Sequence, residues 1–399
     1  RAMTLGISCL LFIIIFCFDS EYSIYYRILV LEILATIMDI SWLYQGAEDF
    51  KKITIRNLII KTLSIILIFT LIKDESDLII YMLIYVLTNV VGNGSLWINI
   101  TKYIDFKYIK SVNIRKYIKP AVTMLIPQIA SSIYTVLDKT MLGALCNDIS
   151  EVGYYEQAQK IVKISLTVIT SLNTVMVPKI AKNFYDGNIE QVNKYMGKTF
   201  NFIWFLGVPM MLGIVTISNK FVPWFFGDGF EKVVMLLNAT TPLIVFIAFS
   251  TAIGSQYLMS IGKQNIHTKT VIIGAIINAI TNFLLIPKLM SMGAIIASVL
   301  AEGTIAVIEI IYIIKKQGIK LSIIFDKCWN YIIAGVIMFV ITWMVGEKME
   351  AKMLTTLIQM LIGSSIYALV LIILRDKFFI ESVHNIEDKI KQKLKKARS

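Results

Sequence analysis

Charged side chains interrupt the apolar stretches of this chain at helical spacing. Lys160 and Lys163 follow Glu156 along one face of a predicted helix, and Thr167 lies one turn further on. The opposite face of the same helix carries Ile, Val and Leu. A charge at mid-bilayer costs roughly 2.5–3.5 kcal/mol, so such side chains need a partner or a watery cavity. Lysines in a cavity attract an anionic ligand, and this face is therefore a candidate binding surface.

Other predicted helices carry polar side chains at similar spacing. The candidate substrate-binding residues are Lys139, Lys160, Lys163, Asp138, Gln128 and Thr167. Three further carboxylates, Glu32, Asp39 and Glu302, are candidates for coupling transport to H+ or Na+. Asn278 and Asn282 lie four residues apart on another helix. Because lipid cannot solvate such stripes, we expect them to face one another around a hydrophilic cavity between two helical bundles.

The alternative interpretation is local neutralisation of each charge. Glu156 can pair with Lys160 four residues along a helix, and Lys139 lies next to Asp138 in the sequence. Lys160 and Lys163 can also extend their ammonium groups to the membrane surface. In that arrangement the charged residues would need no shared cavity.

No residue pattern indicates catalysis, a metal or a cofactor. The four cysteines are far apart in the sequence: Cys9, Cys17, Cys146 and Cys328. The chain has 2 histidines, too few to complete a metal site with such cysteines. The segments between apolar stretches are too short to fold a catalytic domain. We therefore expect a membrane protein that is not an enzyme and that holds neither a cofactor nor a metal.

The elements that position these residues are long apolar helices. Hydrophobic residues make up 57% of the 399 residues and charged residues 17%, and the mean hydropathy is +0.72, far from the composition of a soluble domain. About 20 apolar residues span a bilayer as a helix. The sequence predicts an all-α polytopic membrane protein with twelve spans near residues 3–18, 22–45, 54–72, 78–100, 119–143, 153–181, 198–217, 231–260, 268–287, 290–313, 328–346 and 353–374.

The net charge is +12, and the basic residues behind it are distributed along the chain in a way that indicates the topology. If residue 1 is cytoplasmic and the spans alternate in direction, 27 lysines and arginines fall in cytoplasmic segments and 6 in external ones. Cytoplasmic loops of membrane proteins carry such an excess of positive charge. The distribution predicts that both ends of the chain are cytoplasmic, and it gives no reason to expect a nucleic-acid partner.

A long basic segment at residues 101–118 divides the chain. Residues 1–100 contain four spans of a predicted N-terminal lobe, residues 119–320 contain six spans of a C-terminal lobe, and residues 328–374 contain two additional spans. The basic segment has an amphipathic aromatic pattern typical of an interfacial helix on the cytoplasmic surface. The tail at residues 375–399 is expected to lie on the anionic inner leaflet. Alternatively, both are solvated charge runs that only set the topology.

Several stretches of the sequence resemble a known family. They are Trp42–Phe50 followed by Ile53–Asn57, then Tyr134–Gly143, then Glu151–Lys163 with Val175–Lys179. These blocks are similar to segments of the bacterial polysaccharide flippases of the MOP superfamily, which include the O-antigen and capsule lipid-linked oligosaccharide flippases. The resemblance follows the whole chain in span order.

The resemblance implies two helical lobes of the MOP/MATE-like type, two extra C-terminal helices and alternating access. It implies that the substrate is an undecaprenyl diphosphate carrying a short glycan, moved from the inner to the outer leaflet of the bacterial cell membrane. Membrane lipids and other glycan-assembly membrane proteins are the implied partners. The family's cationic cavity residues match Lys139, Lys160 and Lys163. The Trp42 segment comes two spans earlier than in the family, so we expect about two N-terminal helices to be absent from this chain.

Other classes of function fit parts of the same pattern. A multidrug or small-molecule exporter of the same superfamily would suit twelve spans. A membrane-embedded glycan polymerase would need a long external loop with catalytic carboxylates or arginines, whereas the predicted external loops are short. A non-transporting scaffold of a glycan-assembly complex is the third alternative. Accumulation of a lipid-linked intermediate on the inner leaflet after loss of the protein would distinguish a flippase from all three.

Overall fold

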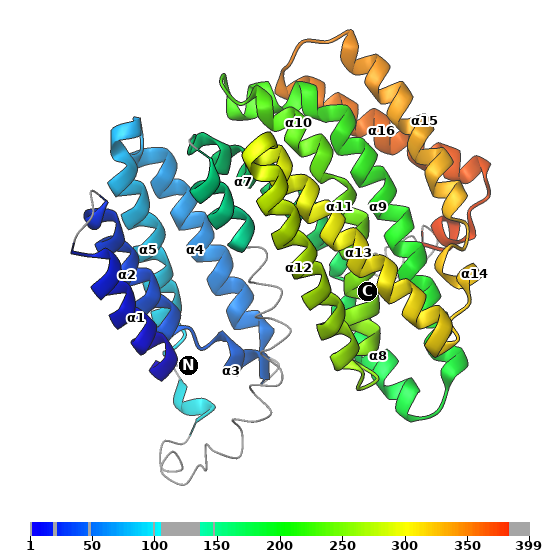
Figure 1. Cartoon of the computed structure of the whole chain (residues 1–399), viewed down its shortest axis with the longest axis horizontal. Helices are drawn as coiled ribbons and strands as arrows, with labels where there is room; N and C mark the ends of the chain where they lie inside the picture. The colour runs from blue at the N-terminus through cyan, green and yellow to red at the C-terminus, as the bar shows by residue number, and fades with distance from the viewer. Residues whose placement is uncertain are drawn as a thin grey trace, which may run out of the picture. The chain divides into compact units, whose positions relative to one another are not determined.

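The structure of the protein is a computed structural model that describes residues 2–18, 22–46, 49–98, 100–104, 136–146 and 148–382. These residues form helices joined by short connections (Figure 1). The chain divides into two compact units, Arg1–Tyr117 and Ile118–Ser399. The second unit holds most of the candidate site residues.

The first unit is a bundle of apolar helices. Its helices are α1 (Ala2–Phe16), α2 (Ser23–Met38), α3 (Ser41–Gly46), α4 (Phe50–Leu71) and α5 (Leu78–Ser95). α5 packs along α2 and α4, and α1 packs along α2. The buried Tyr44 hydroxyl on α3 donates a hydrogen bond of 2.5 Å to the carbonyl oxygen of Leu96. This bond holds the short α3 against the end of α5.

The second unit encloses a larger core. It begins with a helical segment at residues 136–145 and continues with α7 (Ser150–Thr170), α8 (Asn173–Tyr185), α9 (Ile189–Phe226), α10 (Glu231–Thr240), α11 (Pro242–Ser250), a π-helical segment (Thr251–Leu258), α12 (Gln264–Leu289), α13 (Ser291–Gln317), α14 (Leu321–Ile324), α15 (Cys328–Glu347) and α16 (Met353–Ile373). α12 packs along α13, α9 along α15, and α15 along α16. Apolar side chains fill the interior, and large apolar side chains such as Phe283 and Leu361 are also exposed outside it, as expected where lipid is the solvent.

Within the described residues, 8 helices are long and apolar enough to cross a membrane, or up to 9 if the bent pair Ser150–Thr170 and Val175–Tyr185 is one span. Nine of the twelve predicted spans correspond to these stretches. The first predicted span is a shorter apolar helix, Thr4–Phe16, and the second is the 16-residue α2. The predicted span at 119–143 lies mostly outside the described residues. The described part of the chain has an all-helical polytopic membrane fold.

Two predicted spans are broken rather than continuous helices. The prediction of one helix over residues 22–45 was wrong, because α2 ends at Met38 and α3 begins at Ser41. Asp39, between them, has a ψ of 109° and accepts a hydrogen bond from the backbone N–H of Ser41 at 2.9 Å. Such local bonds from aspartate compete with the helical ladder. The predicted span over 153–181 corresponds to two helices, α7 and α8, which meet at an angle of 44°.

α12 and α13 form a tight helical hairpin. Met290 alone separates the two helices, with φ 53° and ψ −130°, a backbone conformation that glycine adopts most easily. Gly293, in the first turn of α13, lies directly against the backbone of α12, because a Cβ atom there would be 2.6 Å from the carbonyl oxygen of Leu285. The small residue allows the two helices to approach closely.

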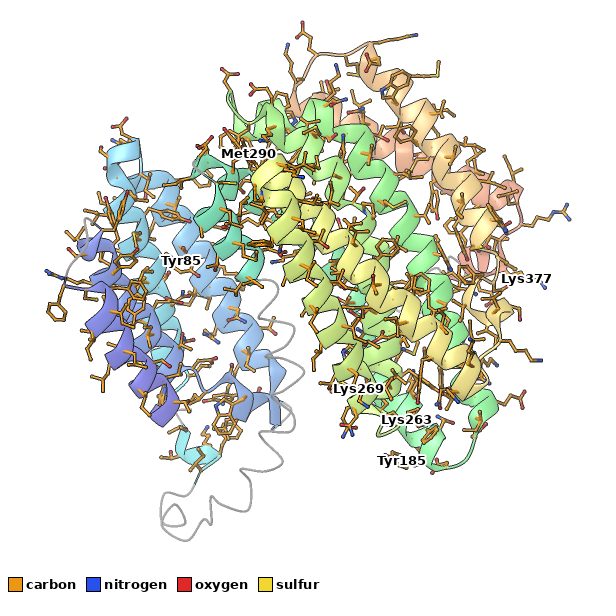
Figure 2. All side chains as sticks on the ribbon, viewed as in Figure 1. Tyr85, Tyr185, Lys263, Lys269, Met290 and Lys377 are labelled. Atoms are coloured by element: carbon orange, nitrogen blue, oxygen red, sulfur yellow. The ribbon has the colours of Figure 1, made fainter. Side chains whose placement is uncertain are left out.

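A buried carboxylate joins three helices at the same end of the unit, where Figure 2 labels Met290. Glu151 on α7 is 3% exposed and accepts a hydrogen bond of 3.1 Å from the backbone N–H of Ser291. The Ser291 hydroxyl donates to the same carboxylate, and Lys232 on α10 forms an ion pair with it. A negative charge at the N-terminus of α13 is also favourable for the helix dipole. The carboxylate therefore fixes the ends of α7, α10 and α13 together.

Replacing Gly293 with alanine is expected to destabilise the second unit by at least about 2 kcal/mol, because the new methyl group meets backbone atoms that cannot rotate away. The measurement is the thermal unfolding midpoint of the purified protein in detergent. Gly153→Ala in α7 is the matched control, since nothing lies within 4 Å of a Cβ atom there. The control should keep or raise the midpoint through better helix propensity. Equal midpoints in both variants would contradict the close approach of α12 and α13.

Candidate functional site

The centre of the second unit holds a buried carboxylate that receives several hydrogen bonds. Asp138, in the helical segment at 136–145, is 2% exposed. Its carboxylate accepts hydrogen bonds from the hydroxyls of Tyr155 at 2.8 Å and Ser298 at 2.6 Å, and from the side-chain amide of Asn282 at 2.6 Å. These donors lie on α7, α13 and α12. The carboxylate therefore links three helices, and a buried polar group of this kind is stable only when it is hydrogen-bonded.

The Asp138 network lines a cavity of ≈ 250 Å³ inside the second unit. The cavity walls are made of Asp138, Lys139, Tyr155, Gln159, Lys163, Leu166, Leu243, Ile247, Ser298 and Glu302. The Gln159 amide donates to the Tyr155 hydroxyl at 3.1 Å, so α7 contributes a connected polar wall. The structure thus brings four of the predicted site residues, Asp138, Lys139, Lys163 and Glu302, to one cavity.

The charged pairs differ from those that the sequence indicated. Lys139 pairs with Glu156 at 2.9 Å, and both side chains are partly exposed. The alternative prediction of a Glu156–Lys160 pair was wrong, as was the prediction that Lys139 neutralises Asp138. Neighbouring residues of a helix point in different directions, so Lys139 and Asp138 do not face each other. Asp138 instead meets neutral hydrogen-bond donors from other helices.

The predicted polar face of α7 lies outside the buried core. Lys160, Lys163 and Thr167 are exposed, while apolar residues such as Val162 are buried. The Thr167 hydroxyl donates to the carbonyl oxygen of Lys163 at 2.9 Å, a bond within its own helix. Lys163 lines the cavity, whereas Lys160 and Thr167 do not. Neither Lys160 nor Lys163 forms an ion pair with any described residue.

The remaining predicted site residues have separate positions. Gln128 lies outside the described residues. Glu32 and Asp39 belong to the first unit, where the Asn89 amide donates to both oxygens of Glu32 at 3.1 Å. Glu302, predicted as an ion-coupling residue, is 5% exposed and lines the same cavity as Asp138.

Sequence reasoning did not single out Tyr155 or Gln159 as site residues. Both lie on the wall of the cavity, and they are hydrogen-bonded to each other. Their spacing of four residues, on a helix that also carries Lys163, was a signal in the sequence. Asn282 was recognised as a polar residue within a predicted helix, but the sequence did not indicate that Asn282 and Ser298 would both bond to Asp138.

The polar groups of the site are suited to binding. They are carboxylates, amides, hydroxyls and ammonium groups, and no group of three or more His, Cys, Asp or Glu residues in the described part of the chain is placed to hold a metal. The Asn282 side-chain oxygen is buried and has no hydrogen-bond partner among the described residues. Together with the Asp138 carboxylate and the Ser298 hydroxyl, it offers the oxygen ligands that a hard cation such as Na+ prefers.

Comparison with known proteins gives relatives along most of the chain. The model of the family described as polysaccharide biosynthesis protein matches residues 1–184. Lipid II flippase MurJ of Bacillus subtilis (strain 168) is 25% identical over 195 residues, which are 47% of this chain and 36% of that protein. A putative O-antigen transporter of Shigella dysenteriae is 23% identical over 291 residues, which are 71% of each chain. The match to the Bacillus protein thus covers about a third of its length.

The fold gives a second line of comparison. A solved structure of lipid II flippase MurJ in an inward closed conformation aligns with a TM-score of 0.72 at 18% identity, covering 94% of this chain and 83% of that one. At this level of identity the likeness shows the fold alone. The family model, the relatives and the fold agree with one another: residues 1–184 are similar to the family of polysaccharide biosynthesis proteins, longer stretches are similar to an O-antigen transporter, and the fold is that of a MurJ-like helical membrane protein.

Proposed function

We propose that the protein flips an undecaprenyl-diphosphate-linked oligosaccharide from the inner to the outer leaflet of the bacterial membrane by alternating access. Relatives named as an O-antigen transporter and a lipid II flippase support a lipid-linked glycan as the substrate. The observation that carries the proposal is a polar cavity within an apolar helical fold, lined by a lysine without an ion pair among the described residues.

The chemistry of the cavity fits a sugar–diphosphate head group. Hydroxyl and amide groups of Tyr155, Gln159 and Ser298 can replace water around a sugar. Lys163 can compensate the charge of a phosphate, and a lysine ammonium binds phosphate as a hydrated point charge that also releases it. Lys139 is held by Glu156 and can add positive charge only by leaving that pair. Lys163 is therefore the residue with the largest proposed role in substrate binding.

The direction of transport has a physical driving force in this proposal. Moving a negative charge outward from a negative interior is favoured by roughly 2.3 kcal/mol per charge per 100 mV if the full potential is crossed. Coupling to H+ or Na+ can add to this force through a carboxylate that binds the ion. Asp138 and Glu302 line the cavity and are the proposed carboxylates for this role. Glu32 and Asp39 belong to the first unit and do not line this cavity. The proposal keeps both ends of the chain in the cytoplasm, in agreement with the distribution of lysine and arginine.

A flipping assay tests the proposal directly. The protein is reconstituted into liposomes with undecaprenyl diphosphate that carries a fluorescent oligosaccharide, and a membrane-impermeant reducing agent measures the glycan that changes leaflet. We expect the rate to exceed that of protein-free liposomes by about tenfold or more. A lipophilic drug cation serves as the comparison substrate. Movement of the cation without movement of the glycan lipid would show a multidrug exporter, and movement of neither would contradict transport.

A further inference from the structure

Another buried acidic group lies outside the cavity, between α12 and α13. Glu309 on α13 is fully buried, and its carboxylate contacts the Nδ1 atom of His267 on α12 at 2.7 Å. The hydroxyl of Thr270 donates to the same carboxylate oxygen at 2.8 Å. His267 is only slightly exposed, with 12% of its side chain accessible. The pair is thus an acid and a base in direct contact, shielded from most of the solvent.

The local backbone is shaped around the histidine ring. The π-helical segment Thr251–Leu258 passes beside it, and a Cβ atom at Gly254 would lie 2.0 Å from His267 Nδ1. Only a residue without a side chain leaves room for the ring in this position. The backbone N–H of Met259 bonds to the carbonyl oxygen of Gly254 at 3.0 Å, which is the wider helical turn of a π-helix. Such turns occur frequently at functional sites.

The charge balance of the pair depends on one proton. With that proton the pair is neutral overall, whether the proton is on the imidazole or on the carboxyl group. Without it, a carboxylate faces a neutral imidazole in a buried site, and an unpaired buried charge costs several kcal/mol. With a second proton, an uncompensated imidazolium results. The buried arrangement therefore favours the state in which the pair holds one proton, either as imidazolium with carboxylate or as neutral imidazole with carboxylic acid.

The groups around the pair do not replace this proton. The neighbouring helices α8 and α11, the π-helical segment and α12 contain no aspartate or glutamate, as their sequences show. Besides His267, the titratable side chains on these elements are Lys179, Lys182, Tyr185, Tyr257, Lys269 and Lys288, and those of α13 besides Glu309 are Glu302, Tyr312, Lys315 and Lys316. Neither Lys263 nor Lys269 forms an ion pair with a described residue. Within this part of the fold, His267 is thus the partner that can neutralise Glu309.

The pair lies near the end of α12 that the distribution of lysine and arginine predicts to be cytoplasmic. Figure 2 labels Lys263, Lys269 and Tyr185 at this end of the second unit, and Met290 at the opposite end. His267 lies between the two lysines in the sequence, in the first turn of α12. The slightly exposed ring therefore gives the buried carboxylate a route for proton exchange with that side of the membrane.

We propose that His267 and Glu309 form a binding site for one exchangeable proton, through which transport responds to pH on the side where α12 begins. Gain or loss of this proton changes the contact between α12 and α13 and the π-helical segment, so helix packing and proton binding are linked. The site is separate from the cavity at Asp138 and acts as a regulatory site. Its effect on transport depends on the proposed function, whereas proton binding itself does not.

Nuclear magnetic resonance of histidine tests proton binding without any transport. The chain has 2 histidines, so ¹⁵N-histidine labelling of the His384→Gln protein leaves the signals of His267 alone. We expect the midpoint of the pH titration of its ring signals to differ between Glu309→Gln and the unsubstituted protein, because the variant lacks the carboxyl group that shares the proton. Gly254→Ala keeps both titratable groups but displaces the ring, and should move the midpoint as well. Gly153→Ala is the control that should leave it in place. An unchanged midpoint in both Glu309→Gln and Gly254→Ala overturns the proposal.

Flipping in liposomes tests the response of transport. The pH is varied on the side where α12 begins, over about three pH units around neutrality. We expect the rate of the unsubstituted protein to change by more than about fivefold, and that of Glu309→Gln by less than about twofold. Equal pH responses in the two proteins overturn the regulatory role. Absence of any flipping, together with the expected resonance shifts, would refute the proposed function and leave the proton site intact.

Discussion

Replacing Lys163 with glutamine is expected to lower the rate of glycan-lipid flipping by about ten- to a hundredfold. Lys163 lines the cavity and forms no direct ion pair with a described residue. Glu156 attracts it, but Glu156 is already paired with Lys139, so the charge of Lys163 is available to a phosphate. Two unit charges about 4 Å apart interact by about 4 kcal/mol at an effective dielectric constant of about 20, and water can replace only part of this energy. The flipping assay in liposomes measures the loss.

Lys160 provides the matched control for this prediction. It lies three residues before Lys163 on α7, is also exposed and also has no ion pair among the described residues, but it does not line the cavity. Lys160→Gln changes the net charge of the protein by the same amount and should retain at least about half of the rate. Lys163→Arg keeps the charge and should retain more activity than Lys163→Gln. Equal losses in Lys160→Gln and Lys163→Gln would show that overall positive charge, and not the cavity, determines the rate.

Replacing Asp138 with alanine is expected to destabilise the second unit by about 2–4 kcal/mol. The substitution removes the shared acceptor of three donors, the hydroxyls of Tyr155 and Ser298 and the amide of Asn282. Each buried donor left without a partner carries a desolvation cost, although hydrogen bonds between membrane helices contribute less on average than this cost alone would indicate. The measurement is the thermal unfolding midpoint in detergent.

Asp138→Asn separates the stability of the network from its charge. The two hydroxyls can rotate and accept hydrogen bonds from the new amide group, while the other side-chain oxygen continues to accept from Asn282. We therefore expect Asp138→Asn to remain within about 1 kcal/mol of the unsubstituted protein. If Asp138 binds Na+ as the coupling ion, flipping by this variant should no longer change with a Na+ gradient, whereas the response to pH through His267 and Glu309 should remain. A variant as unstable as Asp138→Ala would show that the negative charge itself holds the helices together.

The predictions from sequence were accurate where a single helix determines the outcome. Nine of the twelve predicted spans correspond to apolar helical stretches, because a length of about 20 apolar residues is a local property. The break at Asp39 was not predicted, since hydropathy does not report a side chain that bonds to the next backbone N–H. Thr170, Ser171 and Asn173 at the bend between α7 and α8 interrupt the apolar sequence, but hydropathy over the whole stretch does not give the angle between the two helices.

The pairing of charged side chains shows more clearly what could not be predicted from the sequence. Spacing along one helix indicated a bond between Glu156 and Lys160, whereas Glu156 pairs with Lys139 on the preceding helical segment. Periodicity gives the face on which a side chain lies, but it does not give the helix that this face meets. The proposed cavity between two bundles stays a prediction, and the cavity at Asp138 lies within a single unit.

By itself, the sequence determined that the chain folds as apolar helices in a membrane and that its few ionisable residues must find partners or water. Transfer free energies of single side chains are sufficient for both conclusions. Only the tertiary structure decided which groups meet. The partners of Asp138 lie 17, 144 and 160 residues away, and His267 lies 42 residues from Glu309. Contacts over such separations depend on how whole helices pack, because the energy that selects them belongs to the assembled core and not to any one segment.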